Sequence, residues 1–337
     1  MIRISPDLWE SKYTGEFEAN NVARENKKVT VDETIENKTG RMEPVTFAIE
    51  GYQALNKIAF IDGVQRLDMH ATIEDNGFPF QGIFSSNAAG YLMVNPNGVN
   101  SLSECFPEEM PILRRYFIHN DKNISVGNFK FATTEEESGA LNYEYKYVKA
   151  QESKQMQQSM TEFMKEIEQE IMASLVAKDE AELIIADGSL SLQRMKKKPE
   201  GKAVIAGIIK AIEQLYISNE NLPFIAKLKV GQRSPLFSMN YKDYGEEKFS
   251  FFIRLQTPLA YSSGFSNLAR IELEPAITTE AIAKADLIAA TVLFFASGFN
   301  SDARAPQNLY PVIALEKVLK TRLGDIRLIR NRIIDTL

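Results

Sequence analysis

Two short apolar runs that end in Asp-Gly constrain the fold of this chain most strongly. Residues 58–61 read Ile-Ala-Phe-Ile and lead into Asp62, and residues 183–186 read Leu-Ile-Ile-Ala and lead into Asp187. Each pattern predicts a buried strand that ends at a carboxylate, beside a glycine that leaves room for a ligand. Two such strands side by side predict a shared proton or metal site, because neighbouring carboxylates repel each other. Asp-Gly is also a common hairpin turn, which is the simpler interpretation of either motif alone.

Composition narrows the chemistry of such a site. The single cysteine, Cys105, excludes an intrachain disulfide and a cysteine-based zinc site, and His70 and His119 are the only histidines. Carboxylates would therefore have to hold any metal, which favours magnesium or manganese. The net charge of −6 excludes a globally basic nucleic-acid-binding protein and leaves a local basic patch as the alternative.

The order of the expected elements divides the chain. We expect an irregular N-terminal arm or a peripheral strand pair over 1–50, which serves self-association, and one domain over 51–337. Strands are expected over 58–94, where Asp62-Gly63 forms a hairpin and a third strand follows, with an insertion at about 95–150. Apolar residues at three- and four-residue spacing predict a helix over 152–177.

The second half supplies further strands, helices and basic residues. We expect strands over 249–255 and 269–273, a segment at 202–216 that begins as a strand and becomes helical near Lys210, and helices over 279–299 and 312–332. Basic residues that could contact phosphate are spread over this half; they are Arg194, Lys196, Lys197, Lys210, Arg233, Arg254 and Arg270. A solvated loop at 193–199, and strand arginines that pair with carboxylates, are the simpler interpretations.

This order of strand with Asp, hairpin, two more strands, helix with Glu and strand with Asp is typical of a ribonuclease H-like fold. The sequence therefore predicts an α/β (α+β) fold, with a mixed sheet flanked by helices and with insertions. In this fold, carboxylates of the first strand, the helix and the fourth strand converge on two divalent cations, which activate water and stabilise the leaving oxygen at phosphorus.

The chain also resembles the NurA nucleases. The similar segments lie between about residues 58 and 332; they are Phe60-Ile61-Asp62-Gly63-Val64, Leu183 to Leu190, Gly207-Ile208-Ile209-Lys210, Gly231 to Phe237, Arg304 to Leu309 and Ala314-Leu315-Glu316. The resemblance implies a manganese-dependent (or magnesium-dependent) 5′-to-3′ exonuclease with single-strand endonuclease activity. It also implies a homodimer and a partner, the hexameric HerA ATPase, which feeds duplex DNA to the nuclease in DNA repair or phage defence.

Carried over residue by residue, the resemblance assigns metal binding to Asp62 and Asp187. Glu170 is our choice for the helix carboxylate, with Glu166 as the alternative; a solvated acidic face is the simpler interpretation of both. Two departures from the family are visible: the first motif reads Asp-Gly-Val rather than Asp-Gly-Ser, and the C-terminal region lacks a histidine. Asp302, Gln307 and Asn308 would then serve as ligands there, and Arg304 would contact DNA.

Two other functions compete with a nuclease. The first is a catalytically weak or inactive dimer that acts as a structural or regulatory partner of the ring ATPase. The second is a phosphate-ester hydrolase for small substrates, which the lack of a Gly-rich phosphate loop disfavours. The N-terminus has no basic-then-apolar signal, and the longest apolar run, around 287–299, is too short to span a bilayer. We therefore expect a cytoplasmic protein with no membrane contact.

Overall fold

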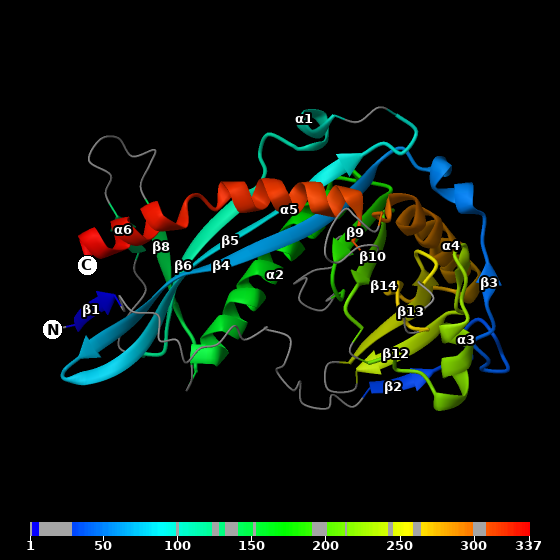
Figure 1. Ribbon diagram of the computed structural model, residues 1–337, viewed down its shortest axis with the longest axis horizontal. Coiled ribbons are helices and arrows are strands. Elements are labelled where there is room, and N and C mark those ends of the chain that lie inside the picture. The colour runs from blue at the N-terminus through cyan, green and yellow to red at the C-terminus, as the bar shows by residue number, and fades with distance from the viewer. Residues whose placement is uncertain are drawn as a thin grey trace.

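The computed structural model is an elongated molecule with a long sheet at its centre (Figure 1). It describes residues 2–6, 29–98, 101–122, 128–131, 141–150, 153–190, 201–212, 214–241, 245–258, 264–298 and 308–337. Helices and strands both occur throughout this part of the chain, so the protein has a mixed α/β fold.

The strands form one mixed sheet. In the described part of the chain its fourteen members include the main path β2-β12-β13-β14-β10-β9-β4-β5-β6-β8-β7, with β1, β3 and β11 paired beside it. The strands are β1 (Ile2–Pro6), β2 (Val29–Asp32), β3 (Val45–Thr46), β4 (Ile58–Asp75), β5 (Phe78–Val94), β6 (Ile112–His119), β7 (Asn128–Phe131), β8 (Leu141–Tyr147), β9 (Leu183–Asp187), β10 (Val204–Ile209), β11 (Gln232–Arg233), β12 (Phe237–Tyr241), β13 (Glu246–Arg254) and β14 (Leu268–Leu273).

Short parallel strands lie at the centre of the sheet. β9 pairs in parallel with both β10 and β4, whereas β5 pairs antiparallel with both β4 and β6. Leu183 to Ile185 are fully buried, as the continuous apolar run predicts for a parallel strand covered on both faces. The expected buried strand before Asp187 is therefore confirmed.

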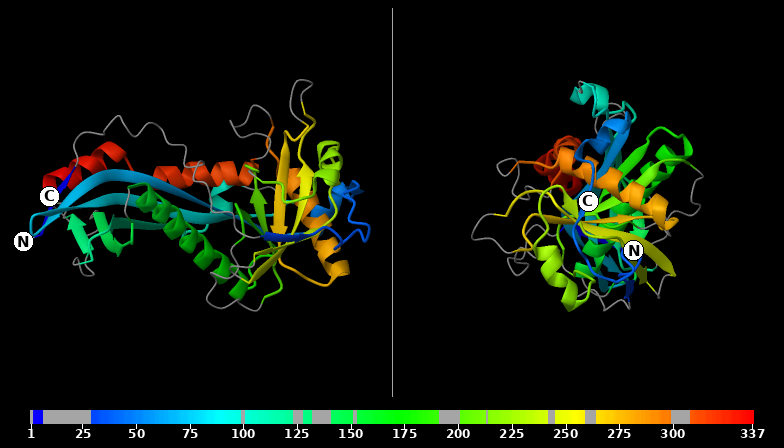
Figure 2. Two further views of the ribbon diagram at one scale, coloured as in Figure 1. Left: turned by 90° about the horizontal axis from the view of Figure 1, so that it is seen from below. Right: turned by 90° about the vertical axis from the view of Figure 1, so that its right-hand side faces the viewer.

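Helices cover both faces of this centre. They are α1 (Leu102–Cys105), α2 (Ser153–Ala177), α3 (Leu222–Ala226), α4 (Thr278–Phe295), α5 (Tyr310–Arg322) and α6 (Ile326–Thr336), with 3-10 turns η2 (Ile49–Ala54) and η5 (Asn219–Asn221). Figure 2 shows α2 on one side of the β4–β5 hairpin and α5 and α6 on the other. Ile61 and Ala186 pack with α2, and Phe60 and Ile185 belong to the cluster that contains α4 and α5.

Three sequence-based expectations need correction. Asp62-Gly63 is not a hairpin turn, because β4 continues without interruption through eighteen residues. The third strand of the antiparallel group is β6, which lies inside the range expected to be an insertion, and Phe78–Val94 is the second. No helix follows Lys210 in the described residues up to 216, where β10 leads into a loop.

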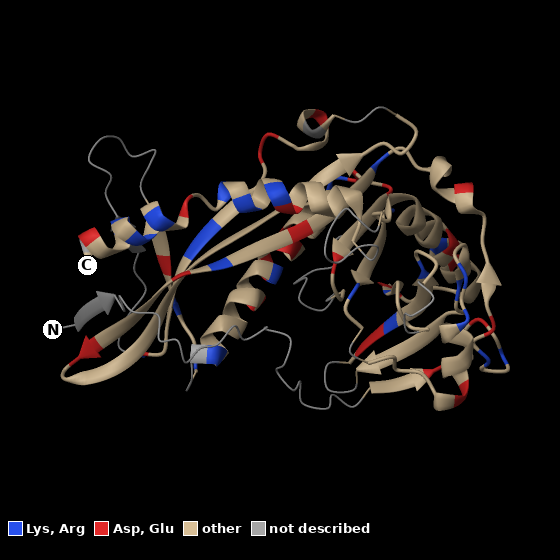
Figure 3. Ribbon diagram, viewed as in Figure 1, with Lys and Arg blue, Asp and Glu red and all other residues tan. Residues whose placement is uncertain are grey.

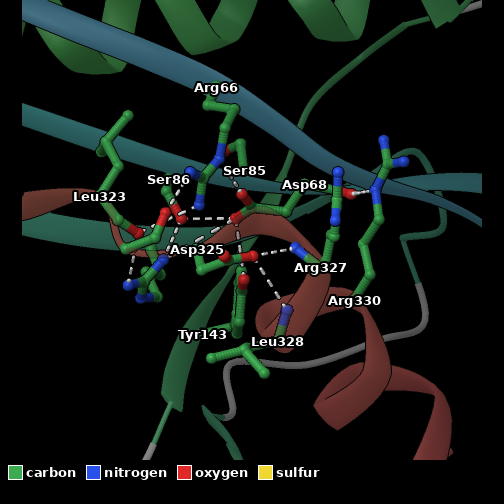
Figure 4. Close-up of polar contacts among 12 residues, drawn as sticks. Arg66, Asp68, Ser85, Ser86, Tyr143, Leu323, Asp325, Arg327, Leu328 and Arg330 are labelled. Atoms are coloured by element: carbon green, nitrogen blue, oxygen red, sulfur yellow. Dashed lines mark hydrogen bonds and ion pairs between the residues drawn. The ribbon is translucent and has the colours of Figure 1, made fainter. Parts of the chain in front are cut away.

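A buried carboxylate anchors the C-terminal helices to the hairpin (Figure 4). The expected helix over 312–332 is two helices, which meet near Gly324, where φ is +81°. Arg66 donates to Leu323 O at 3.0 Å and to Gly324 O at 2.7 Å, and it also pairs with Asp68 at 2.8 Å. Asp68 is fully buried, so this network fixes α5 along β4 and β5.

The described parts of the N-terminal arm join the sheet. β1 pairs with the far end of β4, β2 pairs with β12, and β3 pairs with β11. No helix in the described part of the chain is long and apolar enough to cross a membrane.

Candidate active site

Asp62 and Asp187 lie at the end of the parallel pairing between β4 and β9. Ile61 is opposite Ala186 in the register. Asp62 is the next residue after Ile61, and Asp187 is the next residue after Ala186. Beyond this point β9 ends, and β4 continues alongside β5. Burial, and then the nearby charge of Asp187, raise the pKa of the Asp62 carboxyl to about 7. The predicted proximity of the two aspartates is therefore present.

The side chain of Asp62 faces α5. Asp62 is directly opposite Gly90 in the antiparallel register, so the two residues point to the same face of the sheet. A Cβ on Gly90 would lie 3.4 Å from Leu319 and 3.6 Å from Leu315 of α5. Glu316 of the same helix also raises the pKa of Asp62. A carboxylate of α5 therefore belongs to the surroundings of Asp62.

A third carboxylate, Glu168 of α2, approaches from the other face. A Cβ on Gly63 would lie 2.7 Å from Oε1 of Glu168 and 2.8 Å from Cγ of Met164. Glycine at this position therefore makes room for the helix carboxylate. Glu168 is buried, and burial together with the charges of Asp62 and Asp187 raises its pKa to about 8. Three acidic groups thus influence one another at a single point of the sheet.

A lysine balances the Asp187 side of this cluster. Lys210 follows the end of β10, and its Nζ lies 2.5 Å from Oδ2 of Asp187 and 2.7 Å from Oδ1 of Asn308. The positive charge of Lys210 also lowers the pKa of Asp62, opposing the effect of burial. Asn308 is fully buried at the start of the C-terminal helical region. Lys210 and Asn308 thus meet at Asp187, although the three residues are far apart in the sequence.

The backbone turns sharply after Asp187. Gly188 has φ of +107°, a conformation that side-chain-bearing residues rarely adopt. A Cβ on Gly207 of β10 would lie 2.5 Å from Gly188 O, so the neighbouring strand must also have a glycine. These two glycines allow the chain to leave the sheet immediately after the aspartate.

Glu168, rather than Glu170 or Glu166, is the helix carboxylate beside the aspartates. Glu170 pairs instead with Arg114 at 3.0 Å and is half-exposed, and Glu166 is exposed. Glu166 and Glu170 are four residues apart and both lie on the solvated face of α2. Glu168 lies four residues after Met164 and three before Ile171, which places it within the apolar stripe, and that position was the sequence signal that we missed.

Three arginines assigned to DNA are buried structural residues. Arg233 pairs with Glu36 and Asp286, both at 2.7 Å. Arg254 donates to backbone carbonyls, including Leu228 O at 3.0 Å, and Arg270 pairs with Glu272 at 3.2 Å. Because their guanidinium groups are occupied inside the fold, the prediction that they contact DNA is wrong. An arginine within an apolar strand more often has a buried partner.

Six assigned residues lie outside the described part of the chain. They are Arg194, Lys196, Lys197, Asp302, Arg304 and Gln307. Their predicted roles in DNA or metal binding stay predictions.

The donor chemistry of the cluster suits a hard divalent cation. Carboxylates of Asp62, Glu168 and Asp187 and the amide oxygen of Asn308 are the ligand types that magnesium and manganese prefer. Burial, and then the neighbouring carboxylates, raise the pKa of Asp62 and of Glu168, and a bound cation would oppose this rise. Among the described residues, no three acidic, histidine or cysteine side chains already converge closely enough to form a metal-binding group. The residues fit a metal in type, and Asp187 also contacts the Lys210 ammonium.

These features define a mixed α/β protein with an acidic cluster at the end of its central parallel strands. The NurA domain model matches residues 112–318, which is more than half of the chain. The chain therefore belongs to the NurA family, a family of nucleases. The match includes Glu168, Asp187, Lys210, Asn308 and Glu316, whereas Asp62 precedes it. No curated protein matches the chain.

Proposed function

We propose that this chain is a divalent-metal-dependent DNA nuclease that hydrolyses phosphodiesters at the cluster of Asp62, Glu168 and Asp187. The observation that carries the proposal is the approach of these three carboxylates, from β4, α2 and β9, to one region of the sheet, where burial and then the charges of the two aspartates raise the pKa of Glu168. Carboxylates on the first strand, the following helix and the fourth strand of the core support a ribonuclease H-like arrangement.

Some of the side chains in the cluster would bind the cation, and Lys210 would limit the repulsion between the carboxylates. When bound, manganese or magnesium would lower the pKa of an attacking water and stabilise the leaving oxygen. Asp62 and Asp187 would bind such cations, and Glu168 would complete the negative site from beneath Gly63. Lys210 neutralises Asp187 when no other cation contacts it, which limits the repulsion between the aspartates in the free protein.

The finer activities are also part of this proposal. They are 5′-to-3′ exonuclease and single-strand endonuclease activity, homodimer formation and action with a HerA-type hexameric ATPase in DNA end processing, repair or phage defence. Figure 3 shows basic residues along α5 and α6, and their side chains would contact a nucleic-acid backbone. Lys317, Arg322 and Arg327 are exposed on these helices. A local basic surface of this kind is compatible with the acidic net charge of the chain.

One observation favours a second function, that of a catalytically weak partner of the ring ATPase. The Lys210 ammonium contacts both Asp187 and Asn308, so two of the proposed ligands are already satisfied by the protein itself. A cation would have to displace this lysine or bind beside it. If Lys210 kept its contacts with Asp187 and Asn308 in the presence of the metal, the cluster would stabilise the fold and would not catalyse cleavage.

Cleavage of end-labelled single- and double-stranded DNA in manganese, magnesium or EDTA separates these functions. We expect cleavage in manganese or magnesium and none in EDTA. An absence of cleavage in either metal, both alone and with the partner ATPase, would favour the structural role. Cleavage that persists in EDTA would contradict the metal-dependent mechanism.

A further inference from the structure

A buried ion cluster lies beside the turn that follows Asp187. Glu272 of β14 is fully buried, and Lys248 of β13 and Arg270 of β14 are almost so. The Glu272 carboxylate pairs with Lys248 through Oε2 at 3.2 Å and with Arg270 through Oε1 at 3.2 Å. A buried ion group of this kind contributes little net stability, because desolvation of the charges offsets their attraction. Its other contacts therefore indicate what it does.

The cluster binds both residues that follow Gly188. Oε2 of Glu272 accepts from Ser189 Oγ at 2.7 Å and from the Leu190 amide at 3.1 Å. Nζ of Lys248 donates to Ser189 Oγ at 3.1 Å and to the Leu190 carbonyl. The hydroxyl of one residue and the amide and carbonyl of the next are thus held by two buried charges.

The geometry of the sheet allows the carboxylate to reach the turn. Glu272 is opposite Gly207 in the β10–β14 register, and Gly207 is opposite Ala186 in the β9–β10 register. The three residues form a row across the sheet, and their side-chain positions lie on the other face of the sheet from the Asp187 side chain. Because Gly207 has no side chain, the turn can fold over it and meet Glu272. Gly188 N also donates to Ile208 O at 2.9 Å, which fixes the other side of the turn.

We propose that Glu272 and Lys248 are positioning residues, which fix the carboxylate of Asp187 against Lys210 and Asp62 by holding Ser189 and Leu190. This inference rests on the proposed function in so far as Asp187 binds a metal. The held segment begins two residues after Asp187, so a rotation of the turn moves the aspartate directly. Neither Glu272 nor Lys248 contacts the substrate.

Ser189→Ala tests the inference with little disturbance of the core, because Ser189 is exposed and only its hydroxyl is removed. The matched control is Ser250→Ala. Ser250 is buried directly opposite Glu272 in the β13–β14 register, and its hydroxyl donates to Ile271 O at 2.7 Å rather than to the turn. We expect Ser189→Ala to weaken manganese binding, measured by calorimetry, and single-turnover DNA cleavage by about 10-fold. Ser250→Ala should leave both at the wild-type value.

A metal-free measurement separates the inference from the proposed function. Because Ser189 and Lys210 both act on Asp187, the melting-temperature losses of Ser189→Ala and Lys210→Met should not add in the double variant. The losses of Ser250→Ala and Lys210→Met should add. If the wild type neither binds manganese nor cleaves DNA, the proposed function fails, and this cycle alone decides whether the cluster positions Asp187. Additive losses with Ser189→Ala, or wild-type manganese affinity in an active Ser189→Ala variant, would overturn the inference.

Discussion

Oε1 of Glu168 lies 2.7 Å from the place that a Cβ on Gly63 would take, so the helix carboxylate fills the space left by the missing side chain. This contact links α2 to β4 directly beside Asp62. Asp62 faces α5 across from Gly90, whereas Glu168 comes from the α2 side. The acidic cluster is therefore assembled from both faces of the sheet at the residue where β9 ends.

The identity of the helix carboxylate can be tested with a matched pair of variants. Glu168→Gln removes a buried carboxyl group beside both aspartates and should lower the rate of DNA cleavage by about 100-fold. Glu170→Gln, two residues along the same helix, removes only a half-exposed pair with Arg114 and should stay within about 2-fold of wild type. Equal losses in the two variants would remove Glu168 from the site.

The close contact at Gly63 predicts the effect of a single methyl group. Gly63→Ala would place a Cβ against Glu168 and Met164, at 2.7 and 2.8 Å, so both side chains must move. We expect a loss of about 1–2 kcal/mol in the free energy of unfolding and a larger relative loss of cleavage. Denaturant titration and a cleavage assay on the same sample measure both. The corresponding Gly77→Ala change is made where a Cβ meets nothing within 4 Å but φ is +83°, so it controls for stability loss without displacement of Glu168.

The acidic cluster also predicts how stability depends on pH. The pKa values of Asp62 and Glu168 are raised to about 7 and about 8, above the values of unfolded Asp and Glu. The folded protein therefore holds more protons than the unfolded chain between about pH 4 and pH 8. The contribution of these groups to stability should be greatest at the acid end and fall as the pH rises through 7 and 8.

Thermal melts in EDTA measure this dependence. We expect the melting temperature to fall by about 5 °C or more between pH 5.5 and pH 8.5. The Glu168→Gln variant should show a shallower fall, because its side chain does not ionise. A melting temperature that rises over this range in the wild type, and equally in the variant, would contradict the raised pKa values.

The anchor of the C-terminal helices predicts a stability effect away from the cluster. Asp68 is fully buried and accepts hydrogen bonds from Arg66 and Tyr143, both at 2.8 Å. Asp68→Asn would leave the partly buried guanidinium group of Arg66 without its anionic partner and should cost about 3 kcal/mol of unfolding free energy. Asp325→Ala, which removes the exposed N-cap of α6, should cost only about 1 kcal/mol. Denaturant titrations of both variants test this ranking, and an Asp68→Asn loss no larger than that of Asp325→Ala would show that the network is not an anchor.

Local patterns predicted the elements of this fold better than their ends. The apolar run before Asp187 and the stripe of α2 gave their strand and helix, because burial imposes a period on the sequence. Asp62-Gly63 predicted a turn, but the chain forms a continuous strand there. The glycine is needed because it packs against α2, which lies about a hundred residues later in the sequence. Lys210 meets Asn308 for the same kind of reason, and only the folded chain shows it.

Buried charge was the least predictable property of the candidate site. Glu168 and Arg233 both lie inside apolar patterns, where their charge would ordinarily be costly. Each has a reason that comes from tertiary structure: proximity to the aspartates for Glu168, and pairing with Glu36 and Asp286 for Arg233. A charged residue within an apolar stripe is therefore a better indicator of a site or buried network than a row of exposed charges.

Cleavage by Asp62→Ala and Asp187→Ala variants tests the central claim most directly. End-labelled DNA would be incubated in manganese with each variant and with wild type, after circular dichroism has shown that all three are folded. We predict metal-dependent cutting by the wild type and a loss of at least about 1,000-fold in each variant. Wild-type cleavage by either folded variant would contradict a shared metal site at these two aspartates.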